Sequence, residues 1–237
     1  MDTHQWQYDE MKQIGTDYES RAEIENYDLR MSKIRDIRAE IDEILEELGL
    51  APEQTLLEFG CGTGEFAIGA SARCRQVYAL DVSRAMLEFA EKKARSRNSG
   101  PIRFINAGFL NYRHEDGPVD AVVTQLALHH LPDFWKQIAL INIHGLLAPG
   151  GMLYLRDVVF SLKIEKYRAA IDHTLADFER SAGGDMAAKF ANHVKNEFST
   201  FDWIMEEMLY RAGFHIEGAD YRENFMTVYR CRKAGYA

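Results

Sequence analysis

The stretch from Leu56 to Ala67 constrains the fold of this chain more than any other. It contains a short apolar run that ends in three glycines at alternate positions, Gly60, Gly62 and Gly64, and an apolar pattern typical of a helix follows at once. This order predicts a buried strand, a tight turn and the N-terminus of a helix. Glycine allows positive φ and lets a ligand lie directly against the main chain. The unpaired amides at the helix start would point into the same gap, so the turn predicts a ligand site.

Two kinds of cofactor use such a turn, dinucleotides and S-adenosylmethionine. A dinucleotide fingerprint requires Gly-x-Gly-x-x-Gly, and Glu65 stands where its third glycine would fall. We expect a carboxylate there to repel a pyrophosphate, whereas a sulfonium nucleoside carries no phosphate and tolerates Glu58 and Glu65 nearby. A second apolar run ends in Asp81, roughly 20 residues past the first glycine, where such folds bind ribose hydroxyls. Asp81 is therefore the predicted ribose ligand.

Four segments together resemble the class I S-adenosylmethionine-dependent methyltransferases. They are Glu58-x-Gly60-Cys61-Gly62-Thr63-Gly64, Asp81-Val82-Ser83-x-x-Met86-Leu87, Leu126-x-Leu128-His129-His130-Leu131 and Leu147-x-Pro149-Gly150-Gly151. The resemblance covers residues 50–158 firmly and the flanks loosely. It implies S-adenosyl-L-methionine as cofactor and transfer of its methyl group to a small-molecule acceptor by in-line displacement. Two alternatives stay open: an NAD(P)-dependent oxidoreductase on a Rossmann fold, and a non-catalytic protein that binds S-adenosylmethionine.

Helix-like and strand-like segments alternate along the chain, which predicts a parallel sheet. We expect an α/β fold with a doubly wound, mostly parallel, seven-stranded Rossmann-like sheet that ends in a C-terminal antiparallel hairpin. N-terminal helices and a helical insert after the fifth strand complete it. A single domain over 1–237 is predicted, with a helical lid at 1–48, a cofactor-binding core at 53–158, an insert or cap at 160–198, and a last helix and hairpin at 200–234.

Apolar spacing gives several element boundaries. Residues at three- and four-residue steps predict an amphipathic helix from Asp28 to Leu48. In the insert, a glycine pair at 183–184 separates two apolar stripes, which predicts a helical hairpin. The hairpin could cap the substrate, form a dimer interface or only stabilise the fold. The segment 148–151 predicts a turn before the fifth strand, and Thr200 is the expected cap of a last helix.

Ligands of open α/β sheets bind outside the carboxyl ends of the strands. Thr124 and Gln125 end the fourth predicted strand, so we expect them to face the cofactor. In the loop after the third strand the resembling family places an acid against the adenine amino group, but this chain has Gly108. Adenine recognition is therefore expected from the backbone around Phe109 or from stacking on its ring.

A Tyr-Asp pair at 27–28 resembles the closing N-terminal segment of small-molecule methyltransferases, and the neighbouring Arg30 is expected to meet the cofactor carboxylate. The predicted cofactor-binding residues are Glu58, Gly60, Cys61, Gly62, Gly64, Asp81, Val82, Met86, Gly108, Phe109, Thr124, Gln125, Tyr27 and Arg30.

The pair His129-His130 has three interpretations. Adjacent histidines point in divergent directions, so a metal site with Asp133 is not expected, and we predict no metal. A histidine can instead be hydrogen-bonded under the following turn. As a catalytic group, His129 or His130 could take a proton from the acceptor, because histidine titrates near neutral pH.

Composition excludes several classes of function. A net charge of −9 argues against binding to a nucleic-acid backbone, which relies on clustered Lys and Arg. The three cysteines have no paired spacing, so neither a disulfide framework nor a zinc knuckle is indicated. The N-terminus lacks the pattern of a signal peptide, and no apolar run reaches transmembrane length. We expect a cytoplasmic protein with a small-molecule substrate, no nucleic-acid or membrane partner, and a homodimer left open.

Overall fold

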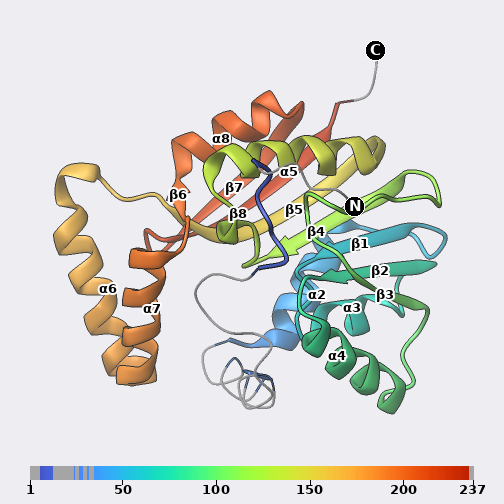
Figure 1. The fold of residues 1–237 in the computed structure, drawn as a ribbon, viewed down its shortest axis with the longest axis horizontal. Helices are drawn as coiled ribbons and strands as arrows, with labels where there is room; N and C mark the ends of the chain where they lie inside the picture. The colour runs from blue at the N-terminus through green and yellow to red at the C-terminus, as the bar shows by residue number, and fades with distance from the viewer. Residues whose placement is uncertain (1–5, 13–23, 25–26, 29–30, 32–34, 235–237) are drawn as a thin grey trace.

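A twisted, mostly parallel sheet forms the centre of the protein (Figure 1). The computed structural model describes residues 6–12, 24, 27–28, 31 and 35–234. The strand order is β3-β2-β1-β4-β5-β8-β7, and β6 pairs with β5 off this path. The bounds are β1 Thr55–Phe59, β2 Gln76–Asp81, β3 Ile102–Asn106, β4 Val119–Gln125, β5 Leu147–Phe160, β6 Thr200–Phe201, β7 Phe214–Arg222 and β8 Met226–Lys233. The pairs β5–β8 and β7–β8 are antiparallel. The predicted fold class is confirmed, with the two-residue β6 as an unexpected eighth strand.

Helices cover both faces of this sheet (Figure 1). One apolar core lies between the sheet and α2, α3 and α4, and a second lies on the face covered by α5 and α8. The helices are α2 Ile37–Leu48, α3 Glu65–Ala70, α4 Arg84–Ser96, α5 Asp133–Leu146, α6 Tyr167–Ala182, α7 Gly184–Asn196 and α8 Asp202–Arg211, with the short 3-10 helices η1 Leu128–His130 and η2 Ile164–Lys166.

Strand β1 lies between β2 and β4, and all five of its residues are buried. This explains its nearly continuous apolar run, because a central parallel strand is covered on both faces. The carboxyl ends of β1 and β4 are neighbours, since Phe59 pairs with Thr124. Connections leave from this point toward opposite faces of the sheet, which places a crevice at the strand ends.

Three predicted boundaries were wrong. The helix predicted from Asp28 to Leu48 is interrupted: Asp28 and Met31 are helical, residues 35–36 are not, and α2 begins at Ile37 because Asp36 caps it, its side chain accepting a hydrogen bond from the Ala39 amide at 3.1 Å. Thr200 caps no helix; it lies in β6, and its hydroxyl donates to Asp133 at 3.2 Å. The predicted turn before the fifth strand belongs to β5 itself, where the register with β4 shifts and Gly150 has a φ of 75°.

The predicted insert forms two antiparallel helices, α6 and α7, which extend away from the sheet at one end of the molecule (Figure 1). Its apolar attachment consists of Phe190 of α7 packed with Val158 of β5 and Phe225 of the β7–β8 connection. Whether the hairpin caps a substrate or contacts another chain stays a prediction.

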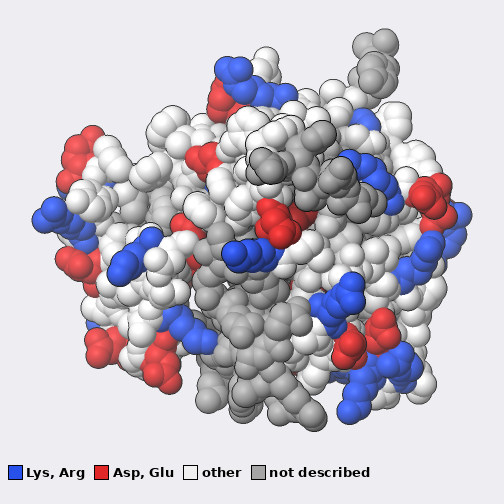
Figure 2. Space-filling view, viewed as in Figure 1, with Lys and Arg blue, Asp and Glu red and all other residues white. Residues whose placement is uncertain are grey.

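Charged side chains are mixed on the face shown in Figure 2, with Lys and Arg lying among Asp and Glu. The described part of this face therefore presents no broad basic surface of the kind that tracks a nucleic-acid backbone. Among the described residues, every helix is too short or too polar to cross a bilayer.

Helix α5 offers a matched test of the core. Ile143→Ala removes a fully buried side chain (0% exposed), and we expect it to lower the free energy of unfolding by about 2–5 kcal/mol. Ile141→Ala, in the same helix but 47% exposed, should change it by less than about 0.5 kcal/mol. Urea unfolding of both variants is the measurement, and equal losses would contradict the assigned helix face.

Candidate functional site

The glycine turn after β1 exposes bare main chain to open space. Gly60, Gly62 and Gly64 all have positive φ, between 51° and 79°. A Cβ on Gly60 would lie 2.4 Å from the Cβ of Ala127, and one on Gly64 would lie 2.9 Å from that of Ala90, so these two glycines permit close packing. A Cβ on Gly62 would have no atom of the described residues within 4 Å. Gly62 therefore faces a space that a ligand can occupy.

Two carboxyl groups border this turn. Asp81, at the end of β2, accepts hydrogen bonds from the amide of Gly62 at 2.7 Å and from that of Ser83 at 2.8 Å. Glu58, in β1, is only 3% exposed, and its Oε2 atom has no hydrogen-bond partner. Burial and the negative charge of Asp81 raise the pKa of Glu58 to about 8. A positively charged ligand would offset both the burial of the Glu58 carboxylate and its repulsion by Asp81.

Two adjoining cavities lie against the turn and share Tyr27, Gly60, Gly62 and Gln125. Among the predicted residues, the first cavity is also lined by Asp81, Val82, Met86, Gly108, Phe109 and His130. The second is also lined by Glu58 and Cys61. Gly64, Thr124 and His129 line neither of these two cavities, and Arg30 lies outside the described residues. Segments far apart in the sequence thus meet around one site.

Comparisons with known proteins show the family of this chain. A family model described as a methyltransferase domain matches residues 56–151. An uncharacterized methyltransferase of Geobacillus kaustophilus is 33% identical over 197 residues, covering 77% of this chain and 88% of the relative. The chain belongs to the methyltransferase family. A second uncharacterized methyltransferase, from Oceanobacillus iheyensis, is 33% identical over 125 residues, covering 53% of this chain and 56% of the relative.

Solved structures of methyltransferases share the fold. Magnesium protoporphyrin IX methyltransferase from Synechocystis, solved with bound SAH, has a TM-score of 0.66 at 16% identity and covers 92% of this chain and 97% of its own. A putative methyltransferase from Bacillus halodurans has a TM-score of 0.64 at 13% identity, covering 83% and 99%. At these identities the likeness concerns the fold alone.

The predicted lid at 1–48 includes no predicted site residue within 6–12, yet three residues of this segment, Tyr8, Glu10 and Lys12, line the first cavity of this methyltransferase. Glu10 is 9% exposed and lines the cavity. Its Oε1 atom accepts hydrogen bonds from the amides of Leu110 at 2.7 Å and Asn111 at 2.9 Å, while its Oε2 atom has no partner. A Cβ on Gly108 would lie 2.4 Å from the Glu10 carboxyl group, so glycine at 108 makes room for it. The departure at Gly108 was the available sequence signal.

Residues 6–12 also contact η1 and α5. The Tyr8 hydroxyl donates to the carbonyl of His130 at 3.1 Å, and the rings of Trp6 and Trp135 stack with their centroids 6.1 Å apart. Tyr8 and Lys12 also line the first cavity. Residues 6–12 therefore connect the loop after β3 with η1 and α5, as the dark blue trace in Figure 1 shows.

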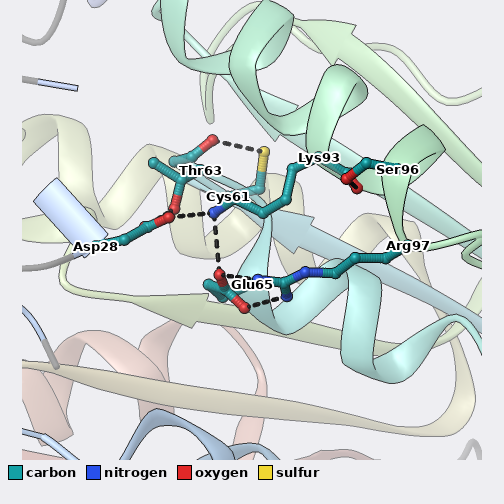
Figure 3. Close-up of polar contacts among 8 residues, drawn as sticks. Asp28, Cys61, Thr63, Glu65, Lys93, Ser96 and Arg97 are labelled. Carbon is teal, nitrogen blue, oxygen red and sulfur yellow. Dashed lines mark hydrogen bonds and ion pairs between the residues drawn. The ribbon is translucent and has the colours of Figure 1, made fainter. Parts of the chain in front are cut away.

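Glu65, expected to repel a pyrophosphate, is neutralised by two cations. Glu65 is paired with Lys93 at 3.0 Å and with Arg97 at 2.7 Å (Figure 3), and these cations lower its pKa although burial opposes them. Because its charge is neutralised, Glu65 does not by itself repel an anion. Lys93 also pairs with Asp28, whose carboxylate accepts a hydrogen bond from Thr63 at 2.5 Å. The cluster attaches residue 28 to the glycine turn.

The two adjacent histidines have different surroundings in this methyltransferase. His129 is buried, with Nδ1 2.5 Å from Asp157 and Nε2 3.2 Å from Glu197. Burial lowers the pKa of His129, but these carboxylates outweigh it and raise the pKa to about 9. Burial and the charge of His129 lower the pKa of His130 to about 3, so His130 is neutral at physiological pH. Of the two, only His130 lines the first cavity.

The raised pKa of Glu58 makes the stability of the methyltransferase pH-dependent. Between pH 4.5 and about 8 the folded state keeps a proton that the unfolded state releases, so wild-type stability falls as pH rises through this window. Glu58→Gln cannot lose that proton. As pH rises through this window, we expect the free energy of unfolding of Glu58→Gln to increase relative to that of wild type by up to about 1.4 kcal/mol per pH unit.

Urea unfolding from pH 5 to pH 8 measures this difference. Glu53→Gln, at an exposed position before β1, controls for the loss of one negative charge. Parallel pH profiles of wild type and Glu58→Gln would contradict the assignment.

Proposed function

We propose that this protein transfers a methyl group from S-adenosyl-L-methionine to a small-molecule acceptor. The observation that carries the proposal is the open space at Gly62, with the Asp81 carboxylate held at its edge by the Gly62 amide. Membership of the methyltransferase family supports it. The alternative of an NAD(P)-dependent oxidoreductase is not favoured, because the family match covers the same glycine turn.

The residues of the site suit this donor. The Asp81 carboxylate, which the amides of Gly62 and Ser83 hold at the first cavity, is the type of acceptor that ribose hydroxyls require. Apolar side chains of Val82, Met86 and Phe109 line the adjoining wall and suit a purine ring. Glu58 supplies a buried carboxyl group toward a cationic donor. When bound, the donor supplies a methyl group on a positively charged sulfur, which is already activated for displacement.

We further propose that Glu10 binds the adenine amino group. Its Oε2 atom is buried at the first cavity without a partner, and an amino N–H could donate to it. Leaving a buried carboxylate oxygen unpaired is costly, so a donor arriving from the ligand would be stabilised. The acid that resembling methyltransferases place in the loop after the third strand would thus come from the N-terminal segment, and Gly108 leaves the space for it.

The rest of the chemistry is positioning. The acceptor must approach the methyl group in line while water is excluded, and alignment of this kind can supply about 7–11 kcal/mol of barrier reduction. The segment containing Tyr8 and Lys12 crosses the first cavity and would exclude water from it. Neutral His130 lines the same cavity and could form a hydrogen bond with the acceptor. His129, with both ring nitrogens facing carboxylates, is assigned no contact with the acceptor.

Calorimetric titration with S-adenosylhomocysteine tests donor binding. Asp81→Ala should weaken binding by roughly 1.5–3 kcal/mol, the value of hydrogen bonds to a charged group. Gly62→Val should weaken it further, because the side chain would fill the space at Gly62. Gly117→Val is the matched control: Gly117 also has positive φ (87°) and open space, but it lies on an exposed loop. Binding of NAD(H) together with indifference to S-adenosylhomocysteine would overturn the proposed function.

His130→Ala separates binding from turnover. We expect the affinity for S-adenosylhomocysteine to stay within a few-fold of wild type, because His130 is assigned to the acceptor side. Methyl transfer to a panel of hydroxyl, amine and thiol acceptors, followed through S-adenosylhomocysteine release, is the accompanying measurement. A large loss of donor affinity would move His130 into the donor-binding set. Turnover of the wild type on the panel would exclude the non-catalytic alternative.

The role of Glu10 is tested by exchanging the base. S-inosylhomocysteine has a carbonyl where adenine has its amino group, so wild type should bind it at least about tenfold more weakly than S-adenosylhomocysteine. Glu10→Gln offers an amide that can donate to this carbonyl, and the preference should shrink or reverse. An unchanged preference in Glu10→Gln would reject the role of Glu10, while binding of S-adenosylhomocysteine to wild type would leave the proposed function standing.

A further inference from the structure

Three imidazoles and a carboxylate converge where the end of α7 meets η1. One ring nitrogen each of His129 and His130 and a carboxylate oxygen of Glu197 lie within 4.8 Å of one another. The Oε2 atom of Glu197 is 3.2 Å from Nε2 of His129 and 2.5 Å from Nδ1 of His193. This single oxygen therefore faces nitrogen atoms from two segments that are more than sixty residues apart in the sequence.

The second ring nitrogens of His129 and His193 also have polar partners. Nδ1 of His129 lies 2.5 Å from Asp157, and Nε2 of His193 lies 2.6 Å from the hydroxyl of Ser199. Metal-binding histidines almost always use their second nitrogen in this way, because the outer partner sets the tautomer and the ring orientation. Each of the two rings thus directs one nitrogen toward Glu197 and holds the other in place.

The backbone positions the cluster independently of its charges. The amide of Phe198 donates to the carbonyl of His129 at 3.0 Å, and the buried Lys136 amine donates to the Phe198 carbonyl and to Asp133. The side chains of His129 and Glu197 are 7% and 6% exposed, and that of His193 is 12% exposed. The donor atoms are therefore preorganised in a nearly enclosed place.

An ion pair alone accounts for only part of this arrangement. Protonated His129 between Asp157 and Glu197 would satisfy those two carboxylates, but it requires neither His193 nor His130. The expectation of no metal rested on the adjacency of His129 and His130, and the sequence could not show that His193 and Glu197 come to the same place.

We propose that His129, His130 and Glu197 bind one divalent first-row transition-metal ion, with His193 as an outer partner that positions the Glu197 carboxylate. Imidazole nitrogens with one carboxylate oxygen suit Zn²⁺, and also Fe²⁺ or Co²⁺. The ion takes the place of the hydrogen that Nε2 of His129 directs toward Glu197. It joins the helical insert to the core, and because His130 lines the first cavity, it lies beside the wall of the proposed methyl-transfer site. The proposal does not depend on the identity of the methyl donor.

The full-length protein, stripped with a chelator and dialysed, provides the test. Calorimetric titration with Zn²⁺ should show one tight equivalent per chain, and Co²⁺ should produce the visible ligand-field absorption of a low-coordinate nitrogen and oxygen site. Thermal unfolding should shift upward with saturating Zn²⁺, because a ligand that binds only the folded state stabilises it. Absence of a stoichiometric tight site in the wild type overturns the proposal, and the cluster is then an ion-pair network only.

Two variants and a matched control locate the site. Glu197→Gln and His193→Gln should each weaken Zn²⁺ binding by about 10- to 100-fold or more, since loss of even an outer-shell partner costs that much. His173→Gln is the control: His173 forms a pair of the same spacing with Asp177, at 3.2 Å, on the exposed face of α6. It should leave the affinity unchanged. Equal affinity in all variants, with circular dichroism showing a native fold, would place the metal elsewhere and overturn the proposal.

Discussion

The hydrogen bond from the Gly62 amide to the Asp81 carboxylate is the interaction on which the site depends. Strands β1 and β2 are parallel and in register, with Phe59 beside Leu80, so the glycine turn and Asp81 emerge level with each other. The bond holds the turn open instead of letting it collapse onto the strand ends. Because the Cβ side of Gly62 is empty, the turn presents main chain to a ligand. A carboxylate and a side-chain-free surface are thereby placed at one point.

The N-terminal part of the chain borders the site formed by Gly62 and Asp81. Glu10 binds the amides after β3, and Asp28 binds Thr63 and Lys93 beside the glycine turn. Glu10 lines the first cavity and Asp28 lines the second. Glu10 occupies space that any side chain at Gly108 would fill, so a small residue in one loop and an acid in a distant segment are physically linked. The proposed donor site is thus built from two parts of the chain rather than from the sheet alone.

The helical insert is joined to the same region through a different set of contacts. Its apolar attachment lies at the end of β5, but its polar attachment is the contact of Glu197 with His129 next to the cavity wall. The insert is thereby joined to η1, which contains His130, through the contact of Glu197 with His129. Its polar attachment lies beside the proposed methyl-transfer site.

The sequence by itself determined the sheet, the glycine turn, the position of Asp81 at the end of β2 and the two-helix insert. Each depends on local periodicity or on residues close together in the chain. It misplaced the start of α2 and the role of Thr200, since local capping by Asp36 and pairing with Asp133 competed with the apparent pattern. Only the tertiary structure decided that Glu10 enters the first cavity and that Glu197 meets His129. Both are contacts between segments that are distant in the sequence. The periodicity of apolar residues along a sequence does not show which buried carboxylate will contact which partner.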